Sequence, residues 1–274
     1  MKKVLIAFDG TQFSEGAFEF ARQLNERQPV LLTGLFIPQV SYAYLWSYTS
    51  AMTGPAYVPF MEAEDGDVVQ RNISRFEDLC VKNSIQYRVH KDFYDFALPE
   101  LKRETRFADL LIISSEKFYE NLQGLNPADY MKDALHEAEC PVVIVPEKFV
   151  FPRHNILAYD GSGSSVFAIK QFAYLFPELC KNNTVLVFSK VDHNLHLPYE
   201  ELITELASQH YPNLNITKLD ADPKKNFSGW LSDEENAILV SGAYGRSMLS
   251  QLFRKSFAEE IITGNKLPVF IAHK

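Results

Sequence analysis

The sequence contains one pattern twice, and this internal repeat constrains the fold more than any other feature. The segment KKVLIAFDGTQFSEGAFEFARQL, residues 2–24, returns as RHNILAYDGSGSSVFAIKQFAYL, residues 153–175. Asp9-Gly10-Thr11 thereby aligns with Asp160-Gly161-Ser162, at a spacing of 151 residues. Solenoid repeats are several times shorter, so a period of this length indicates a duplicated domain.

The repeat has a second, shorter spacing near the end of each copy. Ser114 matches Ser241 and Pro141 matches Pro268, both 127 residues apart. The two spacings differ by 24 residues, which predicts an insertion in the first copy. Residues 38–66, rich in Tyr and containing Trp46, have no close counterpart and are the predicted insertion. An aromatic segment of this kind suits either a partner surface or a cover for the first copy.

Short apolar runs alternate with amphipathic stretches within each copy. Because several runs are apolar on both faces, we expect strands covered by helices on either side. This alternation predicts parallel sheets with right-handed crossovers, and hence an α/β fold of two tandem five-stranded sandwiches. The expected strands lie near residues 4–8, 30–36, 86–90, 110–114 and 142–145, then 155–159, 185–189, 215–219, 237–241 and 269–273.

Helix signals accompany the strands. Ser14 is a predicted N-cap, followed by an apolar helical face of Ala17, Phe20, Ala21 and Leu24. A second face consists of Val69, Ile73, Phe76 and Cys80. We expect the boundary between the domains within EKFVFPR, residues 147–153, dividing the chain into 1–149 and 150–274.

Composition narrows the class of protein. A net charge of −8 and a pI near 5.4 argue against a nucleic-acid partner, which requires a basic face. No secretory or membrane-spanning segment is expected, because the apolar run after Met1 is only five residues long. Three widely spaced cysteines predict reduced, buried thiols and a cytoplasmic protein: Cys80, Cys140 and Cys180.

The stretch SGAYGRSMLSQLFRKS, residues 241–256, lies between an expected strand and an expected helix. Gly242 and Gly245 would allow backbone N–H groups to approach an anion. Ser256 at a helix start would offer a capping hydroxyl and free N–H groups. The alternative is that this loop only connects a strand to a helix.

These features resemble the universal stress protein family in its tandem two-domain form. The resemblance covers essentially the whole chain and rests on Asp-x-Ser/Thr after the first strand, the glycine loop and a terminal PV-I-V strand. It implies an adenine nucleotide alpha hydrolase-like fold. In the family, ATP binds through Gly-x2-Gly-x9-Gly-Ser/Thr, which here corresponds to Gly242, Gly245 and Ser256. By the same resemblance, Asp160 and Ser162 are expected near the ribose and adenine.

The sequence departs from the family motif at Lys255, which replaces the third glycine. Its side chain would either crowd a phosphate or add charge to the phosphate pocket together with Arg246 and Arg254. The first copy departs further. Its residues at the four motif positions are Ser115, Phe118, Ala128 and Asp129, so we expect this copy to bind no nucleotide.

The remaining motifs give weaker evidence of function. His193 and His196 lie near Asp192, but no further ligands occur at metal-binding spacing, so a metal site is not expected. The run DGSGSS lacks the full GxGxxG spacing, and no GxxxxGK[ST] motif occurs. No catalytic residue is predicted.

The sequence therefore predicts a non-enzymatic cytoplasmic stress-response protein that binds an adenine nucleotide, with Mg²⁺, in its second domain. A nucleotide-free scaffold and a slow Mg²⁺-dependent ATP hydrolase are the alternatives. The expected partners are the nucleotide and an unidentified protein, without nucleic acid or membrane. Because the family's homodimers commonly pair their last strands, we expect residues 141–146 and 268–272 to meet across a pseudo-twofold axis as an intrachain pseudo-dimer. Homodimerisation of whole chains stays open.

Overall fold

The chain forms two compact units, Met1–Cys140 and Pro141–Lys274. The structure is a computed structural model, and it describes residues 1–37, 63–91, 97–118, 127–189, 196–219, 236–242 and 267–272. The predicted insertion lies outside these ranges except for residues 63–66, which begin a helix.

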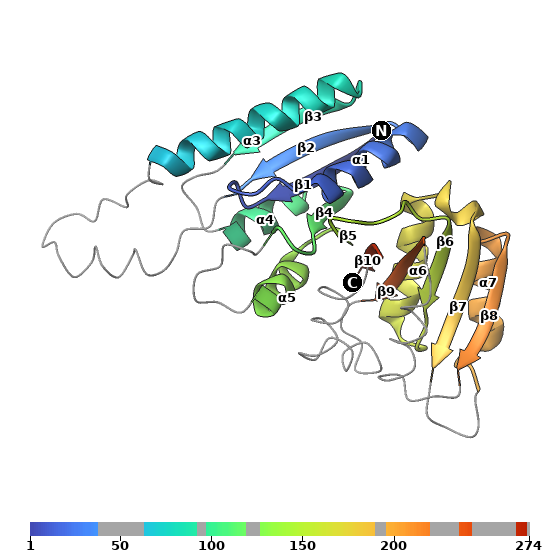
Figure 1. Cartoon of the computed structure of the whole chain (residues 1–274). Coiled ribbons are helices and arrows are strands. Elements are labelled where there is room, and N and C mark those ends of the chain that lie inside the picture. The colour runs from blue at the N-terminus through green and yellow to red at the C-terminus, as the bar shows by residue number, and fades with distance from the viewer. Residues whose placement is uncertain are drawn as a thin grey trace, which may run out of the picture. The chain divides into compact units, whose positions relative to one another are not determined.

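The first unit contains a parallel sheet in the order β3-β2-β1-β4 (Figure 1). Its strands are β1 (Lys2–Phe8), β2 (Val30–Phe36), β3 (Gln86–Lys91) and β4 (Leu110–Ser114). All three strand pairs are parallel. The strand order reverses direction between β1 and β4, which is the position where open α/β sheets bind ligands.

Helices connect these strands as the apolar periodicity predicts. They are α1 (Glu15–Arg27), α3 (Ala63–Lys82), α4 (Ala97–Thr105) and α5 (Pro127–Glu137). The Ser14 hydroxyl accepts the Ala17 N–H at 3.0 Å and caps α1, so this predicted N-cap is confirmed. Both predicted helical faces are buried. α1 packs on β1, β2 and β4, whereas α3 packs on β2 and β3.

The second unit contains a sheet in the order β5-β10-β9-β6-β7-β8. Its strands are β5 (Val142–Val145), β6 (His154–Ala158), β7 (Asn183–Ser189), β8 (Leu214–Leu219), β9 (Ala237–Gly242) and β10 (Val269–Ala272). The strand pairs from β10 to β8 are parallel, and β5 runs antiparallel to its neighbour β10. All ten expected strands are present within about two residues of their predicted ends.

The β5–β10 ladder has a symmetric register. Val143 lies opposite Phe270, its own counterpart at the spacing of 127 residues. Ile144 lies opposite Val269, and Val142 lies opposite Ile271. An antiparallel pair of equivalent strands centred on equivalent residues has local twofold symmetry. The predicted pairing of the two terminal strands is therefore present, while a twofold relation of the complete halves stays a prediction.

Pairing with β10 also determines where the compact units divide. β5 precedes the boundary predicted at residues 147–153, yet it packs within the second unit. The predicted boundary separates the two copies of the sequence repeat, whereas the compact units are defined by which residues pack together. The division into 1–149 and 150–274 thus stays a prediction about the repeat.

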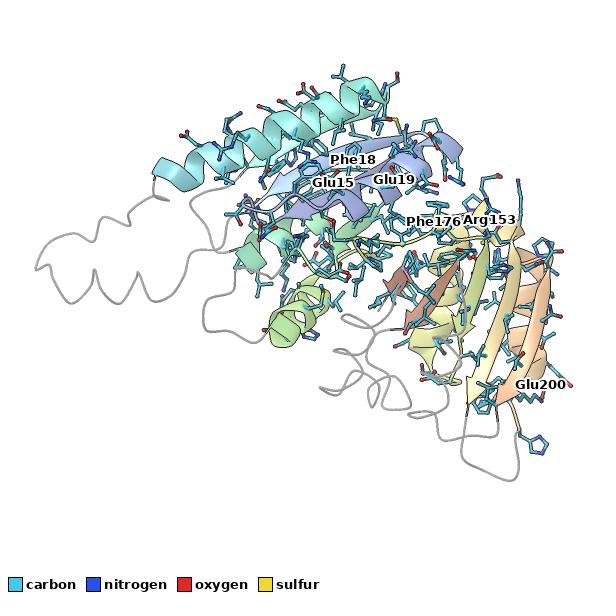
Figure 2. All side chains as sticks on the ribbon, in the orientation of Figure 1. Glu15, Phe18, Glu19, Arg153, Phe176 and Glu200 are labelled. Atoms are coloured by element: carbon cyan, nitrogen blue, oxygen red, sulfur yellow. The ribbon has the colours of Figure 1, made fainter. Side chains whose placement is uncertain are left out.

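The helices of the second unit are α6 (Gly163–Leu175), α7 (Glu200–His210) and the short 3-10 helix η1 (Leu179–Lys181). α6 packs on β9 and β10. Figure 2 shows Glu200, the first residue of α7, at the end toward which β7 and β8 point. Arg153 and Phe176 lie at the opposite end. α7 thus begins at the carboxyl ends of the strands.

Phe270 provides a test of the core of the second unit. Its ring is fully buried and meets Phe172 and Phe176 at centroid distances of 5.3 and 5.8 Å. We expect Phe270→Ala to lower the free energy of unfolding by about 3–5 kcal/mol, because the cavity forfeits both ring contacts. Urea unfolding followed by circular dichroism measures this. Phe107→Ala, which removes a ring that is 68% exposed, should change the free energy of unfolding by less than about 0.5 kcal/mol. Equal losses in the two variants would contradict the place of Phe270 in the core.

Candidate functional site

The turn between β6 and α6 presents two of the predicted site residues. Asp160 Oδ1 accepts the Ser162 N–H at 2.8 Å, and Ser162 Oγ accepts the Ser165 N–H at 3.2 Å. Ser162 is thus the N-cap of α6. Gly161 between them has a φ of +80°, which a side chain would strain. An Asp-Gly-Ser turn therefore leads directly from the strand into a capped helix.

Gly242, the last residue of β9, lies against the start of α6. A Cβ atom at this position would be 2.4 Å from the Ser164 carbonyl carbon and 2.6 Å from the Ser165 nitrogen. Both atoms belong to the backbone, so they cannot move aside as a flexible side chain would. In the sheet, β6 and β9 are neighbours, with Leu157 opposite Val240. The fold thus brings Asp160, Ser162 and Gly242 together where the strand order reverses, at β6 between β7 and β9.

The first helix starts at different positions of the repeat in the two units. Ser162 caps α6 at the position that Thr11 occupies in the first copy. Ser14 caps α1 at the position of Ser165, three residues later. α6 therefore begins almost one turn earlier, close to Asp160 and Gly242. Its first turn lacks an acidic residue, whereas that of α1 contains Glu15. The absence of an acidic residue from the first turn of α6 favours an anion there, whereas the Asp160 carboxylate just before the cap opposes one.

A segment just before α7 contacts the Asp-Gly-Ser turn. The Tyr159 hydroxyl donates to the Pro198 carbonyl oxygen at 2.7 Å. A Cβ at Gly161 would lie 2.7 Å from Pro198 Cβ. Burial, followed by the nearby charge of Asp160, raises the pKa of Tyr159, so its phenol stays a protonated donor. Local sequence patterns did not predict this contact, because Tyr159 and Pro198 are distant in the chain.

The equivalent turn in the first unit is closed. Asp9 is only 3% exposed, and its Oδ1 accepts the N–H groups of Thr11 and Gln12 at 2.9 and 2.8 Å. Asn72 on α3 donates to the carbonyl oxygens of Gly10 and Thr11. Lys117, after β4, donates to Gln12 Oε1 at 3.1 Å. These bonds occupy the turn and tie it to both neighbouring segments.

Aromatic rings fill the carboxyl ends of β1 and β2. Phe8 stacks on Phe13 and on Phe36, with ring centroids 5.0 and 4.9 Å apart. The Arg75 guanidinium lies 4.7 Å above Phe13. The residue at the position of Phe13 in the second copy is Ser164, which has no ring. The first unit therefore replaces an open helix start with an apolar stack.

The first copy also lacks the counterpart of Gly242. The sequence spacing makes Ser115 its equivalent, and the strand register makes it Ser114, because Val4 faces Leu110 whereas Asn155 faces Ile238. Both serines are buried. Phe118 is also buried, while the side chains of Ala128 and Asp129 lie outside the described residues. By either correspondence a side chain occupies the position of Gly242.

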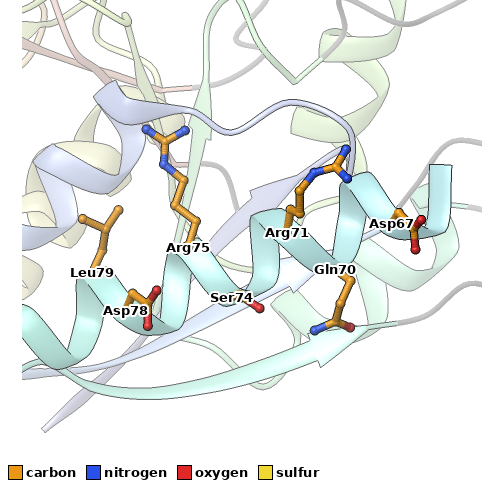
Figure 3. A pocket seen from close by; sticks show the side chains of 7 residues that line it. All are labelled: Asp67, Gln70, Arg71, Ser74, Arg75, Asp78 and Leu79. Carbon is orange, nitrogen blue, oxygen red and sulfur yellow. The ribbon is translucent and has the colours of Figure 1, made fainter. Parts of the chain in front are cut away.

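A shallow hollow of about 630 Å³ lies along the exposed side of α3 (Figure 3). Its lining consists of Asp67, Gln70, Arg71, Ser74, Arg75, Asp78 and Leu79. In Figure 3, Arg71 and Arg75 point to one side of the helix and Gln70 and Asp78 to the other. Arg75 also pairs with Glu15. With mixed charges from one helix, this hollow does not select a class of ligand.

Part of the predicted site lies outside the described residues. This applies to Gly245, Arg246, Lys255 and Ser256, so their roles stay predictions. Asp192 and His193 also lie outside, and His196 is exposed. Within the described ranges, His, Cys, Asp and Glu side chains do not gather in threes that would hold a metal ion. Over those same residues, every helix is too short or too polar to cross a bilayer.

The three cysteines are free and buried. Burial raises the pKa of each thiol to about 12, in Cys80, Cys140 and Cys180. At neutral pH these thiols are protonated, and only a thiolate is an effective nucleophile or metal ligand. The predicted absence of disulfide bonds among them is confirmed.

Comparison with known proteins relates the chain to solved structures. No family model matches it, and a search of curated proteins found no relative. A universal stress protein from Archaeoglobus fulgidus DSM 4304 is 14% identical, with a TM-score of 0.69 over 100% of this chain and 96% of that one. A functionally unknown protein from Pseudomonas aeruginosa PAO1 is 13% identical, with a TM-score of 0.57 over 100% and 92%. A third, from Pseudomonas aeruginosa UCBPP-PA14 and provisionally named a universal stress protein, scores 0.54 at 12% identity over 100% and 93%.

These likenesses show that the chain has the α/β fold of the universal stress protein structures. The fold that the sequence predicted is thereby confirmed. At this level of identity the comparison describes the backbone arrangement, and the chemistry of the site depends on the residues of this chain.

Two glycines of the second unit provide a matched test of the packing at the site. We expect Gly242→Ala to lower the free energy of unfolding by about 1–3 kcal/mol, because the new Cβ meets backbone. Gly163→Ala, whose Cβ would meet nothing within 4 Å at the start of α6, should be neutral or stabilise by up to about 1 kcal/mol. Urea unfolding compares the two variants. Effects of the same sign and size would refute the close contact of Gly242.

Proposed function

We propose that this chain is a universal stress protein that binds one adenine nucleotide in its second unit and acts as a non-enzymatic stress-response regulator. The observation that carries the proposal is the contact of Gly242 with the start of α6. It places a glycine-ended strand, a helix N-terminus and Asp160 at one switch point.

The residues at this switch point suit two different parts of a nucleotide. The start of α6 offers free N–H groups and the positive end of the helix dipole, which stabilise phosphate. Asp160 would repel phosphate, so it suits the hydroxyl or amino donors of the sugar or base. Arg246, which lies outside the described residues, would add positive charge, and Mg²⁺ would neutralise part of the phosphate charge.

The first unit supports a single site per chain. Its Asp9 is buried and accepts the N–H groups of Thr11 and Gln12 within the turn, and Glu15 stands at the start of α1. Phe13 covers the strand ends. A nucleotide would have to displace this stack and face a carboxylate at the helix start. We therefore propose that the first unit binds no nucleotide.

Two properties support a regulatory role in the cytoplasm. The three thiols are protonated at neutral pH and so do not supply a nucleophile. Reduced buried cysteines and the net charge of −8 suit a reducing compartment and a partner other than nucleic acid. The output would then pass to an unidentified protein partner.

A nucleotide-free scaffold is the second candidate. Gly242 favours it as well, because its contact with α6 explains the glycine by packing alone. The nucleotide content of freshly purified protein separates the two candidates. Phosphate release over hours would reveal a slow ATP hydrolase.

Calorimetry with ATP and Mg²⁺ tests the site directly. We expect at most one site per chain, lost in Gly245→Val, whose branched side chain would fill the loop. Asp160→Asn should weaken binding by about 10–100-fold, as for loss of a charged hydrogen bond. Asp9→Asn is the matched control in the first unit and should leave the affinity unchanged. Two equivalent sites, or equal losses in both Asn variants, would contradict the proposal.

Lys255→Gly tests the departure from the family motif. If the lysine side chain crowds the phosphate, the glycine variant should bind the nucleotide more tightly. If its ammonium contacts phosphate, the same change should weaken binding by about 1–3 kcal/mol and flatten the salt dependence. We expect the tighter binding, because glycine lets the backbone approach the phosphate. An unchanged affinity would reject both roles for Lys255.

A further inference from the structure

Residues Leu197–Tyr199, called the strap below, hold the turn that carries Asp160. Leu197 is buried and anchors the strap, while Pro198 lies on Gly161. The Tyr159 hydroxyl reaches the Pro198 carbonyl oxygen at 2.7 Å from a side chain that is only 2% exposed. The strap therefore has an apolar anchor and a hydrogen bond from a buried tyrosine.

The strap holds the turn without closing it. Asp160 stays half-buried, whereas the equivalent Asp9 is 3% exposed. In the first unit, Asn72 of α3 holds the equivalent turn by binding its carbonyl oxygens. In the second unit the strap contacts the neighbouring residues Tyr159 and Gly161 instead. Asp160 is thus supported from the side and stays partly exposed.

The backbone of this region depends on outside support. Gly161, at a φ of +80°, has wide conformational freedom. Tyr199 has a φ of +53° and caps α7 without a side-chain hydrogen bond. A left-handed conformation is unfavourable for an aromatic residue and persists where its surroundings impose it. Without the hydrogen bond from Tyr159, the strap and the turn are expected to sample other conformations.

The strap also gives the site a chemical character. Pro198 packs its apolar ring on Gly161, the residue that follows Asp160, whose carboxylate repels phosphate. A ligand part with hydroxyl or amino donors and a flat apolar face suits this pair, and the nucleoside part of an adenine nucleotide has both.

We propose that Tyr159 is a positioning residue, which holds the strap so that Asp160 meets the nucleoside part of the bound nucleotide. This inference rests on the proposed function, because it concerns the same site. Since Tyr159 acts on the nucleoside end, its removal weakens ATP, ADP and AMP by the same factor. A residue acting on the phosphates would affect ATP most.

The test compares Tyr159→Phe with Tyr211→Phe. Tyr211 is equally suited as a control, because it is 1% exposed and its hydroxyl also donates to a backbone carbonyl oxygen, that of Ile169 at 2.8 Å. Both variants lose a hydrogen bond from a buried tyrosine to a backbone carbonyl oxygen in the same unit, and Tyr211→Phe also removes the interaction of its hydroxyl with the Cys180 thiol. The intended difference is that the bond from Tyr159 holds the strap at the candidate site, whereas the bond from Tyr211 does not.

Two measurements are made on the full chain. Hydrogen exchange without nucleotide should be about fivefold faster in Tyr159→Phe for peptides covering residues 159–165 and 197–203, and unchanged there in Tyr211→Phe. Calorimetry should show affinities for ATP, ADP and AMP that are each about tenfold weaker in Tyr159→Phe and unchanged in the control.

The outcomes separate the inference from the function on which it rests. Absence of nucleotide binding by the unaltered protein would overturn the proposed function, and the exchange data would still decide whether Tyr159 holds the strap. Equal hydrogen-exchange rates in both variants would show that the hydrogen bond from Tyr159 does not hold the strap. Binding that is unaltered in Tyr159→Phe, or weakened for ATP alone, would overturn the positioning role while leaving the proposed function intact.

Discussion

Burial of the central strands on both faces is the constraint on which the rest of the structure depends. Strands β1, β4, β6 and β9 are almost wholly buried, so their residues are apolar on both sides. Such strands need helices on both faces, and a helix between two strands makes them parallel. The carboxyl ends of the parallel strands then lie on one edge of each sheet. Every candidate functional residue that the structure describes follows from that convergence.

The two copies use the same edge differently. In the first, Asn72, Lys117 and the rings around Phe13 close the turn after β1. In the second, α6 starts earlier and approaches so closely that only glycine fits at position 242. The start of α6 thus has no acidic residue in its first turn, whereas aromatic rings fill the equivalent region of the first unit.

The symmetric β5–β10 ladder illustrates what duplication does to an edge strand. A lone apolar strand at the edge of a sheet is a liability, because its free N–H and C=O groups invite pairing with another chain. Here the last strands of the two copies pair with each other within one chain, and this pairing uses those N–H and C=O groups. The ladder centres on Val143 and Phe270, which are equivalent in the repeat. Local twofold pairing of this kind needs no second molecule.

The sequence by itself determined the repeat, the ten strands, the Ser14 cap and the buried helical faces, because each depends on residues that are close in the chain. Periodicity and capping chemistry involve neighbouring residues, so they can be recognised in a single sequence. The resemblance to the universal stress protein family also predicted that Asp160, Ser162 and Gly242 belong to one nucleotide site, and parallel topology brings them to the same edge of the sheet.

Only the tertiary structure decided how these residues meet. The contact of Gly242 with Ser164, the shifted start of α6 and the bond from Tyr159 to Pro198 all depend on the register between distant segments. A Cβ is tolerated or excluded by distances of a few tenths of an ångström, and those distances arise from packing of the whole unit. The glycine that resembles a phosphate cradle in sequence is, in the fold, first a requirement of strand-to-helix packing.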